Sequence, residues 1–177
     1  TSRRGADNGG VEIADILDRA RLRADCVVSP PVSLPLVRRD DGRLPAGVRE
    51  FYENCGGAVL FVGQAREVTL LGPDEVVPAN PVLVGDAGEE DAVSRAAYLI
   101  ARTPGGDHLS VDMSVRRGGR VYDSFHELHG VVGSWPVIAP SFADFLTQIW
   151  EAPGALPYWL GESRDEGRVF PDAYDEA

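Results

Sequence analysis

The stretch Leu44–Gly57 constrains the fold more than any other part of this sequence, because it carries the start, the apolar face and the end of one helix. Pro45 suits a first helical turn, where its missing N–H needs no partner. Gly56 and Gly57 can adopt the left-handed backbone conformation that ends a helix. The spacing i, i+3, i+4 places three apolar residues on one helix face: Val48, Phe51 and Tyr52.

A second stretch, Gly133–Leu146, likewise carries the start and the apolar face of a helix. Ser141 directly follows a proline and can cap a helix by accepting a bond from a backbone N–H. Asp144 lies three residues further on, at the acidic position of a capping box. An apolar face follows at helical spacing: Phe142, Phe145, Leu146 and Ile149. The segment Val11–Arg23 also has helical periodicity, so three helices are predicted.

Strand-like segments separated by tight turns lie between the second and third predicted helices. Proline excludes regular structure from Pro78–Pro81 and makes Cys26–Pro35 an extended connector, while Val82–Val84 is at most a strand fragment. Few helices separate the strands, which favours an α+β domain with an antiparallel sheet of about five to six strands and helices mainly on one side. The predicted strands are Ala58–Val62, Glu67–Leu71, Ala96–Arg102, His108–Val115, Arg120–Phe125 and Trp135–Ile138. The alanines of Ala96–Arg102 leave a helix open as the alternative there.

The order of these features resembles the SUKH superfamily, a group that includes bacterial immunity proteins and a fungal cell-wall regulator. The matching order is a Leu-Pro helix that ends in Gly-Gly, then strands, then a helix that opens Ala-Pro-Ser-Phe. The resemblance covers roughly Val11 to Glu151. The residues that match the family pattern are expected to determine the fold: Gly56, Gly57, Pro140, Ser141 and Phe142.

The domain organisation follows from the same comparison. We expect a flexible N-terminus over residues 1–10, a SUKH-like domain over residues 11–151 and a C-terminal extension over residues 152–177. Within the extension, Leu156–Leu160 is apolar enough to dock on the body, and Gly161–Ala177 is charged. The acidic segment Gly85–Ser94 is expected to be a surface loop.

Net charge restricts the classes of partner. The formal charge is −11, and every one of the 17 basic residues is arginine. Nucleic-acid binders need basic residues to displace counterions from phosphates, so this class is excluded. An acidic surface suits a protein partner with a basic surface, because opposite fields accelerate their encounter. The same charge would also serve solubility alone.

Three sequence features indicate the cellular compartment in which the protein is expected to work. No apolar run approaches the ~20 residues that span a bilayer, and no signal-peptide pattern precedes the first predicted helix. Cys26 and Cys55 do not make a disulfide framework, and Cys55 is expected to be a buried free thiol. These features favour a cytoplasmic protein that does not bind membranes.

His126 and His129 form the cluster that most resembles a metal-binding or catalytic site. On a helix they could share a metal with Asp123, but their spacing is not that of a zincin, and no third histidine or cysteine lies nearby. A polar turn with locally bonded histidines is the alternative. Ser134 and Ser141 are equally weak candidates for a nucleophile, since no G-x-S-x-G elbow is present. We therefore predict no catalytic residue, no cofactor and no metal.

The strand pattern places acids and aromatic residues together. Asp112 falls on the polar face of its strand, and the next hairpin arm brings further acids toward it. Acids beside aromatic side chains suit an Arg/Lys-rich partner. The alternatives are a solvated face for the acids and a core position for the aromatic residues. The candidate partner-binding residues are Asp112, Tyr122, Asp123, Glu127 and Trp135.

The SUKH resemblance implies a non-catalytic protein-binding domain. Bacterial relatives act as immunity proteins, each of which neutralises a cognate toxin, often a nuclease, by stoichiometric binding. The expected partner is therefore a protein toxin or another basic protein. A regulatory or scaffold module that binds another protein or a small ligand is the alternative, and an enzyme built on His126 and His129 is a third reading.

Overall fold

The computed structural model describes residues 12–37, 43–86, 92–160 and 170–171. The predictions for residues 1–10, for the middle of the acidic segment and for most of residues 161–177 lie outside this part of the chain. The helices are α1 (Ile13–Arg21), α2 (Ala46–Asn54), α3 (Ala79–Leu83) and α4 (Phe142–Glu151). The strands are β1 (Cys26–Val28), β2 (Ala58–Leu60), β3 (Val68–Leu70), β4 (Ala97–Arg102), β5 (His108–Asp112), β6 (Val121–Asp123), β7 (Pro136–Ala139) and β8 (Phe170–Pro171).

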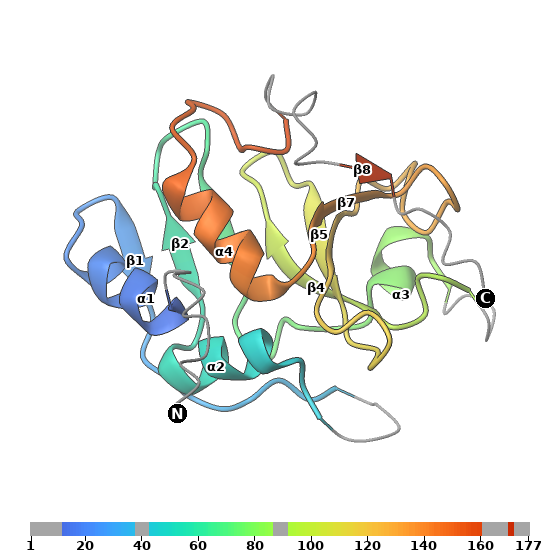
Figure 1. The fold of residues 1–177 in the computed structure, drawn as a ribbon, viewed down its shortest axis with the longest axis horizontal. Helices are drawn as coiled ribbons and strands as arrows, with labels where there is room; N and C mark the ends of the chain where they lie inside the picture. Colours follow the sequence, from blue (N-terminus) through green and yellow to red (C-terminus); the bar gives the residue numbers. More distant parts are fainter. Residues whose placement is uncertain (1–11, 38–42, 87–91, 161–169, 172–177) are drawn as a thin grey trace, which may run out of the picture.

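The strands form one antiparallel sheet in simple chain order. Within the described residues, seven strands from β1 to β7 pair each with the next, and the two-residue β8 extends the sheet at β7. The predicted α+β class is therefore confirmed (Figure 1). The sheet exceeds the six predicted strands because β1 forms inside the predicted connector and β8 lies in the C-terminal extension.

Three helices pack as a group against one face of the sheet. Helices α1, α2 and α4 contact each other, and α4 also contacts β7. Figure 1 shows α1 and α4 in front of the sheet. Ring contacts join α2 to α4 through Phe51 and Phe142, whose centroids are 5.4 Å apart. The apolar segment 156–160 packs on the body in part, since Tyr158 and Trp159 are buried in the same core, whereas Leu156 and Leu160 are exposed.

The predicted capping box explains where α4 begins. The Ser141 hydroxyl accepts a hydrogen bond from the Asp144 N–H at 3.1 Å and donates to the Asp144 carboxylate at 2.6 Å. Pro45 is the cap residue of α2, one position before the first turn that the sequence suggested for it. The helix ends at Asn54 with an extended Cys55 as its cap residue, so the predicted glycine cap is wrong. Of the two glycines, Gly57 has a positive φ of 111°, and the next strand begins directly after it. The buried faces of α2 and α4 are the predicted apolar sets.

Helix α3 corrects the expectation that prolines exclude regular structure from this segment and leave at most a strand fragment after it. Pro78 occupies the cap position, and Pro81 is the third residue of the five-residue helix. At both positions the backbone N–H would have no partner inside the helix, so proline removes no helical hydrogen bond. A short helix therefore forms where the composition argued against one.

The sheet is covered differently along its width. Across β2 to β5, the row Ala58, Leu70, Ala101 and Leu109 is buried, whereas the opposite row Val59, Thr69, Arg102 and His108 is half-buried or exposed. Across β4 to β7, however, the second face is buried too, because Leu99, Ser110, Tyr122 and Val137 are all covered. The face of β5 that carries Asp112, expected from alternation to be the polar face, is thus packed as well.

Gly56 should tolerate no side chain. A Cβ atom there would lie 2.4 Å from the carbonyl oxygen of Pro30, in the backbone of the chain that leaves β1. We expect Gly56→Ala to lower the free energy of unfolding by about 2 kcal/mol or more, because the backbone must move to relieve the overlap. Urea denaturation measures this change.

Gly105→Ala is the matched control. A Cβ atom at this exposed turn position would meet its nearest neighbour at an ordinary 3.8 Å. We expect a change within about 0.5 kcal/mol. Equal effects of the two substitutions would contradict the packing argument.

Candidate functional site

The five predicted binding residues lie on β5, on β6 and in the segment between β6 and β7. Asp112, Tyr122 and Trp135 are buried, Asp123 is half-buried and Glu127 is exposed. The aromatic residues thus occupy the core, which was one of the two alternatives. The buried three present no surface to a partner in this structure. Partner contact remains a prediction, and it rests on Glu127 and Asp123.

Asp112 holds the turn that joins β5 to β6. One carboxylate oxygen accepts a hydrogen bond from the Ser114 N–H at 2.8 Å, and the other lies 3.4 Å from Nη1 of Arg117. Arg117 also donates to the carbonyl oxygen of Val93 at 3.0 Å. The Asp112 side chain is 1% exposed and that of Arg117 is 10% exposed. Asp112, which was expected on a polar surface of β5, therefore forms an internal ion pair. Its partner Arg117 lies in the following turn and could not be identified from the alternation of residues along the strand.

Trp135 covers the second face of the sheet at β6. Its ring stacks on Tyr122 with centroids 3.8 Å apart and planes at 17°. The rings of His129 and Trp135 are nearly perpendicular, with centroids 4.9 Å apart, and the indole nitrogen lies 3.4 Å from Oγ of Ser124. This aromatic cover explains why Tyr122 is buried although it lies on the face opposite the three packed helices.

A chain of buried polar side chains lies beneath the segment between β6 and β7. Oγ of Ser110 bonds to Oγ of Ser124, which lies 3.1 Å from Nδ1 of His129. Nε2 of His129 lies 2.7 Å from Oδ1 of Asn80 on α3. A neutral imidazole satisfies both contacts when Nε2–H donates to Asn80 and Nδ1 accepts from Ser124. Burial lowers the pKa of His129 to about 4, which keeps the ring neutral near pH 7.

This arrangement explains both histidines without a metal. His129 is buried, while the exposed His126 contacts Phe125 with centroids 4.5 Å apart and ring planes inclined at 55°. Within the described residues, no group of three His, Cys, Asp or Glu side chains could hold a metal ion. Ser124 and His129 resemble a nucleophile and its base, but both are buried inside the packed second face of the sheet. Ser141 caps α4, as predicted.

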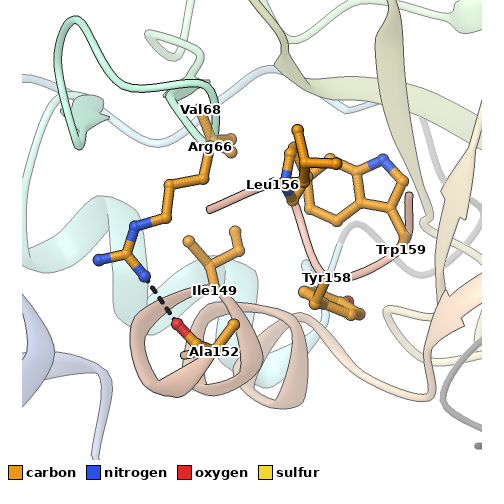
Figure 2. A pocket seen from close by; sticks show the side chains of 8 residues that line it. Arg66, Val68, Ile149, Ala152, Leu156, Tyr158 and Trp159 are labelled. Atoms are coloured by element: carbon orange, nitrogen blue, oxygen red, sulfur yellow. Dashed lines mark hydrogen bonds between the residues drawn. The ribbon is translucent and has the colours of Figure 1, made fainter. Parts of the chain in front are cut away.

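A small pocket lies where the C-terminal segment returns to α4 (Figure 2). Its walls are mainly apolar, and Nη1 of Arg66 donates to the carbonyl oxygen of Ala152 at 2.7 Å. The Arg66 guanidinium also stacks over Phe61, 3.6 Å from the ring centroid. Arg66 therefore secures the end of α4. The lining residues are Arg66, Val68, Ile149, Ala152, Leu156, Pro157, Tyr158 and Trp159.

Both cysteines are free and buried, as expected for Cys55. Burial raises the pKa of the Cys55 thiol to about 11, so this side chain is an inert part of the core. In the part of the chain that the structure describes, no helix combines the length and apolar character needed to cross a membrane.

Comparisons with known proteins agree with the resemblance found in the sequence. The family model described as the SMI1 / KNR4 family (SUKH-1) matches residues 41–148. The chain is also 38% identical over 160 residues to a protein named Immunity protein YokJ from Bacillus subtilis (strain 168), and the alignment covers 90% of this chain and 94% of that protein. No solved structure gives a significant match.

Asp112→Asn tests the internal ion pair. The substitution keeps an oxygen that can accept the Ser114 N–H, but it removes the buried negative charge that faces Arg117. We expect the free energy of unfolding to fall by about 3 kcal/mol. As a control, Glu53→Gln removes an exposed pair with Arg49 and should cost less than about 1 kcal/mol. Similar losses in the two variants, measured by urea denaturation, would refute the assignment.

His129 should make stability depend on pH. Its ordinary pKa of 6.5 in the unfolded chain falls to about 4 in the folded protein, so the unfolded state binds more protons between these values. The stabilising contribution is complete above about pH 6.5 and is lost as the pH falls toward 4. We expect the stability advantage of the natural chain over His129→Gln to shrink by about 1–2 kcal/mol between about pH 7 and about pH 5. Parallel stability curves for the two proteins would contradict this assignment.

Proposed function

Because this chain belongs to the SMI1/KNR4 (SUKH-1) family, we propose that it is an immunity protein that neutralises a cognate toxin by stoichiometric binding. The observation that carries the proposal is the 38% identity to Immunity protein YokJ over nearly the full length of both chains. Such coverage means that the whole domain is shared rather than one motif. Neither the matching family model nor this relative bears the name of an enzyme.

Charge supports a basic partner. The net charge of −11 gives the protein a negative field that attracts a positively charged surface over several ångströms. A nuclease toxin fits this requirement, since a cleft that holds phosphates carries basic residues. An acidic protein seated over that cleft would exclude the nucleic acid. Inhibition then needs occlusion alone and no chemistry by the bound protein.

The proposed place of action is the cytoplasm of the cell that makes the protein. Two buried free thiols support a reducing compartment, because such a compartment keeps thiols reduced. A toxin that enters the cell would meet the immunity protein there before it reaches its target.

Coexpression is the direct test of this function. The probe is the C-terminal domain of the protein encoded next to this gene, expressed in a susceptible host with and without the present chain. We expect the chain to restore growth and to form a one-to-one complex with that domain in calorimetry. Binding without rescue would indicate a regulatory or scaffold module, and absence of both would refute the proposal.

The rate of association should depend on salt. Screening shortens the reach of the negative field, from a Debye length of about 14 Å at ~0.05 M salt to about 4 Å at ~0.5 M. We expect the association rate constant to fall by about tenfold or more over that range, with a smaller change in the dissociation rate. Stopped-flow fluorescence measures both rates. A salt-independent association rate would exclude electrostatic attraction as the cause of fast binding.

A further inference from the structure

We propose that the toxin docks on the surface formed by the end of α3 and by the turn between β6 and β7. We name this the valine surface, and it comprises Val82, Val84, Val131 and Val132, with Glu127 and Asp86 at its rim. The inference rests on the proposed function and specifies which face of the protein performs it.

The hydrogen bond between Asn80 and His129 brings these two segments together. Its 2.7 Å length joins residues 49 positions apart in the sequence. Val82 and Val84 follow Asn80 by two and four positions, and Val131 and Val132 follow His129 by two and three. Each of the four valines therefore lies within four sequence positions of Asn80 or His129, the two residues that this hydrogen bond joins. Figure 1 shows α3 at the same end of the molecule as the start of β7.

The four valines are exposed, as are other large apolar side chains elsewhere in the described residues. Their exposed fractions run from 44% to 53%. Isolated exposed apolar residues are ordinary, but a group on one surface is typical of an interaction site. A partner that covers the group removes this apolar area from water, which favours association.

Two exposed acidic residues belong to the same segments as the valine surface. Glu127 is exposed in the same turn as Val131 and Val132, and Asp86 is exposed two residues after Val84. Interfaces combine an apolar centre with a polar rim, and the sign of the rim selects the partner. An apolar centre with an acidic rim fits a basic protein that carries an apolar side chain at the centre of its own contact.

The turn is held in a fixed shape before any partner arrives. The carbonyl oxygen of Phe125 accepts hydrogen bonds from the N–H groups of Leu128 and His129, both at 2.9 Å. The carbonyl oxygen of Val131 accepts from Ser134 at 3.0 Å and from Trp135 at 2.9 Å. Little conformational entropy is then lost when the turn is bound, which favours affinity.

Another group of exposed apolar residues fits a basic partner less well. Val27 and Val62 are 57% and 45% exposed, near the start of the sheet. The guanidinium groups of Arg23 and Arg66 both lie over the ring of Phe61, the residue directly before Val62. Arg23 is also paired with Asp25 at 2.7 Å, so this region carries both signs of charge. The exposed acids Glu127 and Asp86 therefore favour the valine surface for a basic partner.

Arginine substitutions test the assignment with the same toxin domain as probe. Val132→Arg and Glu127→Arg each place a positive charge on the valine surface. Val62→Arg and Glu151→Arg are the matched controls, because each introduces arginine at an exposed position of the same residue type elsewhere. We expect Val132→Arg and Glu127→Arg each to weaken binding by about tenfold or more, and each control to change affinity by less than about threefold.

The outcomes separate this inference from the function on which it rests. If the natural chain binds and neutralises the domain but all four variants bind equally well, the valine surface is refuted and the proposed function stands. If the natural chain neither binds nor neutralises it, both are refuted. Hydrogen exchange on the natural complex avoids any dependence on variant folding. Protection should increase over 125–134 and 82–86, and protection confined to other segments would overturn the inference.

Discussion

The hydrogen-bonded chain from Asn80 through His129 and Ser124 to Ser110 is the interaction on which the second half of the sheet depends. It links α3, the turn before β7, and β5, which are otherwise separate parts of the sequence. Buried polar groups are costly unless they are bonded, and here each member finds a partner in the next. The chain therefore fixes a single arrangement of the segments that cover this face.

The helices and most strands followed from the sequence because their signals are local. A proline, a capping serine and an apolar spacing lie within a few residues of each other, and all three act on the backbone nearby. Helix α3 was missed because its two prolines fall at the cap and in the first turn, where they do no harm. Strand β1 was missed because three residues beside a proline-rich segment carry little periodicity.

The candidate site was harder to predict, since its decisive contacts join distant residues. Alternation correctly placed Asp112 opposite Leu109 and Val111, but it carried no information on what covers that face. The covering groups come from Asn80, His129 and Trp135, and the charge of Asp112 is balanced by Arg117. Of the five predicted binding residues, Glu127 and Asp123 keep the accessibility that partner contact needs. The exposed valines could not be recognised beforehand, because valine occurs throughout this sequence.

The order of the strands in the sheet follows the order of the chain, and this affects how the protein can fold during its synthesis. Because each strand that the structure describes pairs with its neighbour in sequence, most sheet contacts join nearby residues. Each new strand can add to the growing edge as synthesis proceeds, without waiting for a distant segment to return. For a protein proposed to guard its own cell, such assembly would shorten the interval between translation and protection.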